Sequence, residues 1–137
     1  MYKVEKTAIS KCSKSVYINP KTIFYNQNGQ QKSWDFVENI DSVAVLVFHK
    51  QKNCFIFVKQ FRPPVFEHLE KNLNIFDTEK TPKGFTIELV AGLLDKKGLS
   101  PEEAVREEMI EEIGYRVDTK RIEKIVAYLG NVGISGF

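Results

Sequence analysis

The stretch Glu88–Tyr115 constrains the fold most, because it contains a helix whose two ends are both marked in the sequence. Ser100 is a suitable N-cap, and Pro101 stands at a first helical position where its missing N–H costs nothing. Glu103 completes an S-x-x-E capping box with Ser100. Gly114 suits the left-handed residue that follows many helices. The sequence therefore predicts a capped helix that ends just before Gly114, entered from a short apolar strand.

The predicted helix has two distinct faces. At about 100° per residue, one face is apolar and comprises Val105, Met109 and Ile113, with Ile110 beside them. The neighbouring face presents three carboxylates, from Glu108, Glu111 and Glu112. Oxygen ligands without a nearby His or Cys suit Mg²⁺, or alternatively Mn²⁺. A solvated acidic face is the other interpretation, but like-charge i,i+4 pairs oppose helix stability, which favours the metal.

Residues 92–115 resemble the Nudix box, G-x5-E-x7-R-E-U-x-E-E-x-G-U, where U is a bulky apolar residue. The matching positions are Gly92, Glu108, Met109, Glu111, Glu112, Gly114 and Tyr115. The flanking segments KSWDF (Lys32–Phe36), VKQFRPPV (Val58–Val65) and ELVAGLLD (Glu88–Asp95) are similar to those of the UDP-sugar (UDP-glucose) pyrophosphatase branch. The resemblance runs from about Lys14 to the end of the chain.

Two positions depart from the box pattern. The loop after the turn at Gly92 is one residue longer, which puts Leu99 where the first Glu belongs. The UDP-sugar branch shares this loop and an apolar residue there. Glu107 occupies the Arg position, with Arg106 one place early. In the family, the first Glu and the Arg of the box tend to pair with each other. With Leu99 and Glu107 at these two positions, the resemblance implies that this scaffold interaction is lost. We expect the added carboxylate of Glu107 to tighten cation attraction but to repel a diphosphate, and so to alter or weaken activity, which replacement by Arg or Lys would test.

Composition describes a single-domain chain of ordinary type. The 137 residues are 42% hydrophobic and carry a net charge of +2, which gives no support for nucleic-acid or membrane-surface binding. The N-terminus does not resemble a signal peptide, and no apolar run approaches membrane length, so we expect a cytoplasmic protein. Cys12 and Cys54 have no metal-type spacing and are expected to be reduced thiols, with one disulfide as the alternative.

The order of predicted elements gives an α+β class. We predict an N-terminal hairpin (residues 1–36) turning at Asn28-Gly29, then a second part (residues 37–137). The expected strands are Ser15–Ile18, Thr22–Tyr25, Gln31–Phe36, Asp41–Lys50, Cys54–Phe61, Phe85–Val90 and Arg121–Leu129. The Asp41–Lys50 and Cys54–Phe61 pair is expected to be buried on both faces, and residues 62–84 to be irregular.

The resemblance makes the expected fold more definite. It implies an α/β/α Nudix sandwich with a mixed sheet and an accessory N-terminal hairpin sheet. Family members continue beyond the equivalent of Phe137, so we expect the C-terminal part of the fold to be missing.

Three further residues are candidates for substrate contacts. The family's E-L-x-A-G motif implies a metal or substrate contact at Glu88, and the alternative is a surface Glu on an edge strand. Arg62 suits bidentate contact with a phosphate or with the box carboxylates, and the alternative is an ordinary surface Arg. For Trp34, the only tryptophan, three roles are considered: stacking on a nucleotide base, filling a dimer interface or packing in the core. His49 and His68 show no partner pattern and are given no role.

The resemblance implies a Mg²⁺-dependent hydrolase of nucleoside diphosphate sugars. UDP-glucose would be split to UMP and glucose 1-phosphate, with ADP-ribose as a second substrate and a homodimer as the working form. The general base is one of the box glutamates or a Glu from a later loop. The alternative is a catalytically impaired module, because of the missing C-terminal part, that binds a nucleotide sugar or serves in dimerisation.

Overall fold

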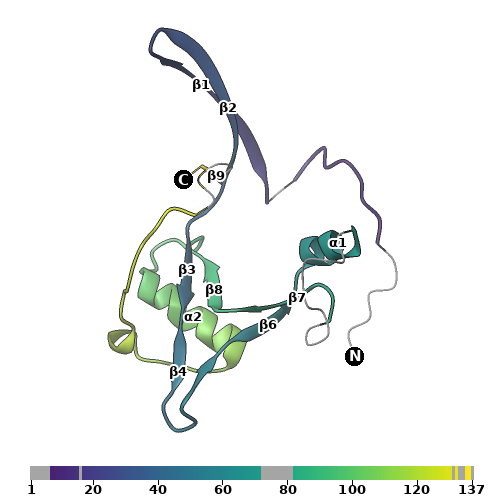
Figure 1. Ribbon diagram of the computed structural model, residues 1–137. Coiled ribbons are helices and arrows are strands. Elements are labelled where there is room, and N and C mark those ends of the chain that lie inside the picture. The colour runs from purple at the N-terminus through teal and green to yellow at the C-terminus, as the bar shows by residue number, and fades with distance from the viewer. Residues whose placement is uncertain (1–6, 16, 72–81, 131, 133–134, 137) are drawn as a thin grey trace. The chain divides into compact units, whose positions relative to one another are not determined.

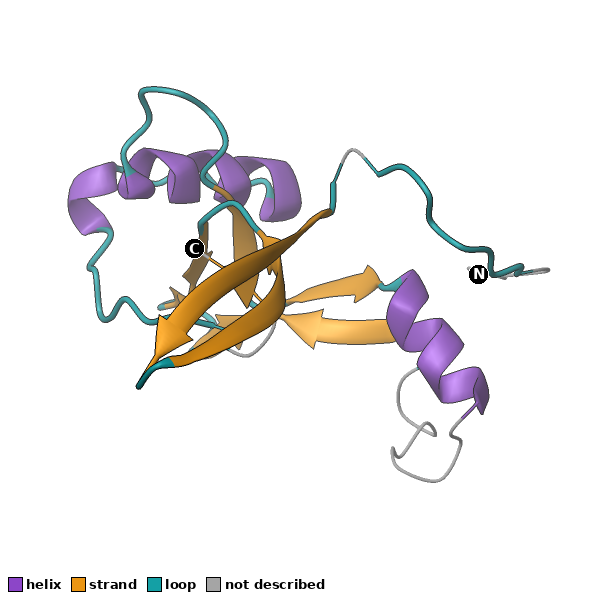
Figure 2. Cartoon of the chain, turned by 90° about the horizontal axis from the view of Figure 1, so that it is seen from above, coloured by secondary structure: helices purple, strands orange, loops and turns teal. Residues whose placement is uncertain are grey.

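The structure is a computed structural model that describes residues 7–15, 17–71, 82–130, 132 and 135–136. Within these residues the chain is mixed α/β, with two α-helices and several strands (Figure 2). The chain divides into two compact units, one of Met1–Asn39 with Ala127–Phe137 and the other of Ile40–Val126. In the described residues, neither helix has the length and apolar character needed to cross a membrane.

The first unit is built on a long hairpin. Strand β1 (Asn19–Gln27) pairs antiparallel with β2 (Gln30–Glu38), and the short β9 (Ser135–Gly136) runs parallel to β2 (Figure 1). The turn is the one predicted from the Asn-Gly pair, because Asn28 and Gly29 both have positive φ angles, of 54° and 77°. Thr22 donates from Oγ1 to Asp35 Oδ1 across the strands, at 2.6 Å.

The prediction of two short strands separated at Asn19-Pro20 is wrong. Both residues lie inside β1, where Pro20 is tolerated because β1 is an edge strand of the described sheet. The segment before it makes a turn instead, since the Ser15 hydroxyl accepts hydrogen bonds from the N–H groups of Tyr17 and Ile18.

In its described residues, the second unit contains three antiparallel pairs of strands. β3 (Ser42–Val45) pairs with β8 (Val90–Leu93), β4 (Val47–His49) with β5 (Cys54–Ile56), and β6 (Val58–Phe61) with β7 (Phe85–Glu88). Each long strand predicted here is interrupted at one residue where its pairing partner changes, at Leu46, Phe57 and Leu89.

Helix α2 (Pro101–Ile113) lies against β3 and β8 and closes the core of this unit (Figure 1). Its capping box is formed in both directions between Ser100 and Glu103, and Gly114 has the predicted left-handed φ of 71°. The buried cluster consists of Val58, Val90, Val105 and Met109. The predicted apolar stripe is therefore confirmed, except that Ile110 is 38% exposed.

The prediction that the 41–50 and 54–61 strands are buried on both faces is wrong. Phe48 and Phe55 stack edge-to-face with ring centroids 5.2 Å apart, yet both are about half exposed, as are Leu46 and Phe57. Successive side chains of a strand point to opposite faces, so only every second side chain of these strands points toward the core. Cys12 and Cys54 are both free and exposed.

Two other segments differ from the sequence prediction. Helix α1 (Pro63–Lys71) replaces the start of the predicted irregular loop, because its two prolines occupy first-turn positions where no N–H is needed. The strand predicted at Arg121–Leu129 is absent: a 3₁₀ turn η1 (Thr119–Arg121) is followed by chain without regular structure. Residues 72–81 of the predicted loop lie outside the described residues.

Candidate metal and diphosphate site

The candidate site forms where the acidic face of α2 meets the ends of strands β6, β7 and β8. Strand alternation puts Gln60 on the same face as the buried Val58, and Arg62 follows directly after the end of β6. The β6–β7 register sets Thr86 opposite Gln60 and Glu88 opposite Val58. Polar groups from two strands thus share one face.

Arg62 and Glu88 form a two-point ion pair on this face. The guanidinium donates from Nε to Oε1 of Glu88 at 2.8 Å and from Nη2 to Oε2. Thr86 Oγ1 also donates to Glu88. These hydrogen bonds, first of all those from Arg62, lower the pKa of Glu88 to about 2. The structure therefore joins two residues that were predicted separately, and it fixes the plane of the guanidinium.

Glu112 joins the helix to two strands. Its carboxylate accepts a hydrogen bond from Gln60 Nε2 and another, at 3.2 Å, from the N–H of Ala91 in β8. The negative charge of Glu112 also contributes to a raised pKa of Arg62, after the larger effect of Glu88. The carboxylate of Glu112 on the helix and the guanidinium of Arg62 after β6 therefore interact through their charges.

Glu108 lies over Gly92. A Cβ atom at Gly92 would overlap the carboxyl group of Glu108, so only glycine leaves room for this side chain. The turn predicted at Gly92 is wrong. Gly92 lies inside β8 opposite Val43, and the strand continues to Leu93. Burial raises the pKa of Glu108, and the charges of Glu111 and Glu112 raise it further.

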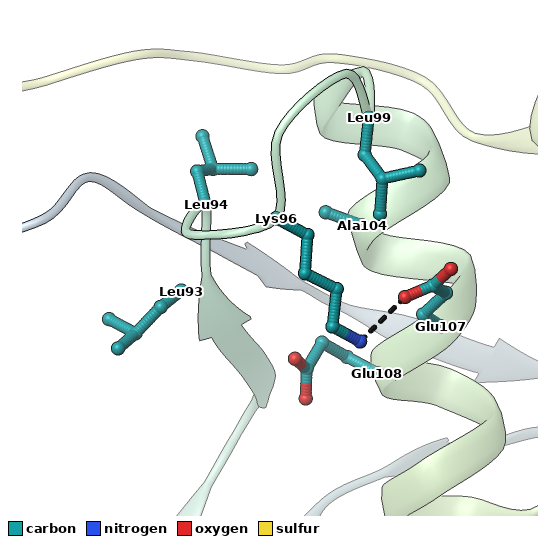
Figure 3. A pocket seen from close by; sticks show the side chains of 7 residues that line it. All are labelled: Leu93, Leu94, Lys96, Leu99, Ala104, Glu107 and Glu108. Atoms are coloured by element: carbon teal, nitrogen blue, oxygen red, sulfur yellow. Dashed lines mark hydrogen bonds and ion pairs between the residues drawn. The ribbon is translucent and has the colours of Figure 1, made fainter.

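Glu107, the residue that departs from the box pattern, has a partner. Lys96 from the β8–α2 loop places Nζ 2.7 Å from Oε2 of Glu107 and 3.5 Å from Oε1 of Glu111. Figure 3 shows the Lys96 side chain reaching across to the helix, with Glu108 beside it. Leu99 points toward the helix on the same side and lines a small pocket with Leu93, Leu94 and Ala104.

The donor atoms present suit a hard divalent cation, although the carboxylates bind protein groups here. Among the described residues, no three acidic, His or Cys side chains are grouped as a metal site. Glu112 accepts from Gln60 and Ala91, and Glu111 faces Lys96. Because the negative charges of Glu111 and Glu112 add to burial in raising the pKa of Glu108, a cation among the three carboxylates would relieve this repulsion. Glu108, Glu111 and Glu112 are the side chains that would hold such an ion.

Trp34 lies in the other unit, in β2 opposite Ile23. It is 54% exposed, which excludes the simple core-packing interpretation. His49, for which no role was predicted, contacts the Tyr115 ring edge-on with centroids 6.1 Å apart.

Sequence reasoning missed two residues and one contact of this region. Gln60 could have been found from alternation, because it is two residues from Val58 and two from Arg62. Lys96 could have been found by looking for a nearby cation, because Glu107 and Glu111 are a like-charge i,i+4 pair that a cation would stabilise. The contact of Gly92 with Glu108 carried no sequence signal, because it depends on how closely α2 approaches β8.

Comparison with known proteins gives relatives that cover almost the whole chain. It is 38% identical to the uridine diphosphate glucose pyrophosphatase NUDT14 of Bos taurus, over 99% of this chain and 68% of that protein. The corresponding protein of Mus musculus is 34% identical over 98% of this chain and 67% of its own length. A GDP-mannose pyrophosphatase of Yersinia enterocolitica is 28% identical over 80% of this chain and half of its own length. The chain matches no protein-family model.

These relatives confirm the resemblance read from the box and its flanking segments. Identity of 34–38% along nearly the entire chain includes the helix, the loop and the strands that carry the candidate site. The chain belongs to the Nudix hydrolase family.

Proposed function

We propose that this protein hydrolyses the pyrophosphate bond of a nucleoside diphosphate sugar. The leading substrate is UDP-glucose, which would give UMP and glucose 1-phosphate, and ADP-ribose is a second candidate. The named activities of the relatives support this class of substrate. The observation that carries the proposal is that acidic helix residues and the Arg62–Glu88 pair meet on one face, where Glu112 acts on Arg62.

Glu108, Glu111 and Glu112 are the residues that would hold the metal, Mg²⁺ or alternatively Mn²⁺. When bound, the ion would neutralise charge on the diphosphate and favour attack by water at phosphorus. Glu108 contributes a carboxylate whose position is set by Gly92. Hydrogen bonds from Gln60 and from the N–H of Ala91 hold Glu112 beside the strands.

Arg62 is assigned to the diphosphate. A guanidinium offers two parallel N–H donors that match a phosphate as well as a carboxylate. In the structure Glu88 occupies these donors and keeps the group oriented. A phosphate arriving here would compete with Glu88 for them, which frees Glu88 to contact metal or substrate. The general base remains one of the box glutamates or a Glu from a later loop.

Several finer features belong to the same proposal. The strands and two helices are compatible with the α/β/α Nudix sandwich, with the 1–36 hairpin as its accessory sheet and residues 37–137 as the Nudix domain. A cytoplasmic homodimer is proposed, with Trp34 reaching the base of the nucleotide or the partner. The exposed apolar side chains of the hairpin, such as Phe24 at 80% and Trp34, support the dimer. Size-exclusion chromatography with light scattering measures the mass of the protein in solution and so tests the proposed dimer.

Phosphorus NMR tests the reaction itself. UDP-glucose is incubated with the folded protein and Mg²⁺, and then with EDTA in place of Mg²⁺. We expect UMP and glucose 1-phosphate to appear only with the metal. Folded protein that binds UDP-glucose without splitting it would support the alternative, a nucleotide-sugar-binding or dimerisation module. The same assay with ADP-ribose and GDP-mannose ranks the substrates.

A further inference from the structure

Lys96 bridges two glutamates that stand one turn apart on α2. Its ammonium group is 2.7 Å from the Glu107 carboxylate and 3.5 Å from that of Glu111 (Figure 3). Lys96 belongs to the loop of residues 94–100, which joins β8 to the helix. The contact therefore ties the middle of this loop to the second half of the helix.

The helix needs a cation at this place. Residues 101–113 include six glutamates and one arginine, and the last turn contains no basic residue. Glu107 and Glu111 are a like-charge i,i+4 pair, and acidic side chains near a helix C-terminus also oppose the helix dipole. The charge that offsets both effects comes from outside the helix, on Lys96.

The two contacts of Lys96 are unequal, and this decides their roles. At 2.7 Å the Glu107 contact is a charge-assisted hydrogen bond, whereas 3.5 Å to Glu111 is at the limit for one. Glu107 is therefore the lasting partner. Glu111 can turn away at little cost while Lys96 stays attached to Glu107.

We propose that Lys96 is a positioning residue of the carboxylate site, acting through Glu107. It holds the β8–α2 loop against the helix, offsets the charge of Glu107 beside the site, and leaves Glu111 free for a divalent cation. The ion pair stands on the geometry alone, and its role in the site rests on the function proposed above. The expectation that Glu107 repels a diphosphate took no account of Lys96.

A charge-swap cycle tests the ion pair. The variants are Lys96→Glu, Glu107→Lys and the double variant, with melting temperatures measured in EDTA. Each single change sets like charges together, so we expect each to lower Tm by on the order of 2–5 °C. The double variant should recover to within about 1 °C of the original protein, because it restores the pair in reverse. Lys96→Arg, which keeps the pair, should behave like the original.

Lys97→Glu is the matched control. It makes the same change of charge in the same loop at an exposed neighbouring residue. We expect its Tm to stay within about 1 °C of the original. If instead the Tm losses of the two single variants add in the double variant, the ion pair is not formed in solution and the proposal is overturned.

Mn²⁺ binding without substrate, followed by electron paramagnetic resonance, tests the positioning role. Glu107→Lys should weaken binding on the order of tenfold, because it adds positive charge beside the cluster. Lys96→Met removes a positive charge, which by itself would tighten Mn²⁺ binding, so a weaker binding by this variant is the result expected if Lys96 positions the carboxylates. Tighter binding by Lys96→Met would overturn the positioning role. If the Tm changes show that the ion pair forms but Mn²⁺ affinity is unchanged in both single variants, Lys96 only holds the loop to the helix. Its role in the site would then be overturned. Failure of the proposed function would show differently, as absence of Mn²⁺ binding and hydrolysis in the original protein.

Discussion

Gly92→Ala should damage the site while leaving the fold almost intact. The added Cβ would overlap the carboxyl group of Glu108, so that side chain must move. It is the far end of a flexible side chain, and moving it is cheap for the fold. Alanine is well tolerated in the β8 ladder, and the change from glycine stabilises a compatible site by about 0.4–1 kcal/mol through the unfolded state. We therefore expect Tm to change by no more than about 3 °C.

The cost appears in metal binding and turnover. Disturbing a group that orients a metal ligand typically costs about 10–100-fold in affinity or activity, which corresponds to roughly 1.4–2.7 kcal/mol. Mn²⁺ affinity and kcat/KM for UDP-glucose measure it. Gly130→Ala is the matched control, because nothing lies within 4 Å of a Cβ there, and it should change neither quantity.

A double-variant cycle tests the physical route. If Gly92→Ala acts by displacing Glu108, adding it to Glu108→Gln should cause little further loss. Full additivity of the two losses would refute this reasoning, and so would a Gly92→Ala protein with unchanged Mn²⁺ affinity.

Three other predictions concern stability. Because the pKa of Glu88 is lowered from 4.5 to about 2, its stabilising effect is complete above pH 4.5 and disappears as pH falls toward 2. Arg62 is 47% exposed, so we expect a screened loss of about 1–2 kcal/mol across this window, and Arg62→Met should flatten the plot of unfolding free energy against pH. Gln60→Ala removes a donor to Glu112 and should cost about 1–2 kcal/mol in urea unfolding; an unchanged midpoint would contradict that hydrogen bond. Ser100→Ala breaks the capping box and should cost about 1 kcal/mol, whereas Ser100→Asp should retain most of it.

Local signals predicted the parts of the fold that depend on local interactions. The capping box at Ser100, the stop at Gly114 and the Asn28-Gly29 turn each need only a few neighbouring residues, and all three are as predicted. The prolines of α1 lie in a segment that was predicted to be irregular, although the proline ring, which ends a helix in its interior, favours the first turn.

Predictions that depend on a partner strand failed more often. The Arg121–Leu129 segment is rich in β-forming residues, yet a strand also needs a neighbour to pair with. In the described structure Ile125 and Tyr128 are more than 80% exposed. The interruption at Leu46 likewise reflects a change of pairing partner, from β8 to β5, that no local pattern specifies.

The candidate site was predictable as a set of residue types and not as a geometry. Spacing on the helix gave the acidic face, and the family resemblance gave Arg62 and Glu88. Their mutual ion pair and the engagement of Glu112 by Gln60 follow from the β6–β7 register and from how α2 lies on the strands. Such contacts join residues far apart in the chain, which single-sequence patterns do not encode.

The central claim is that the carboxylates of Glu108, Glu111 and Glu112 hold the divalent cation, and Mn²⁺ titration tests it most directly. The original protein is compared with the triple variant Glu108→Gln, Glu111→Gln, Glu112→Gln, with circular dichroism to verify that both are folded. The account predicts Mn²⁺ binding by the original protein and a loss of at least about 100-fold in the triple variant. Equal Mn²⁺ affinity in the two folded proteins would contradict it.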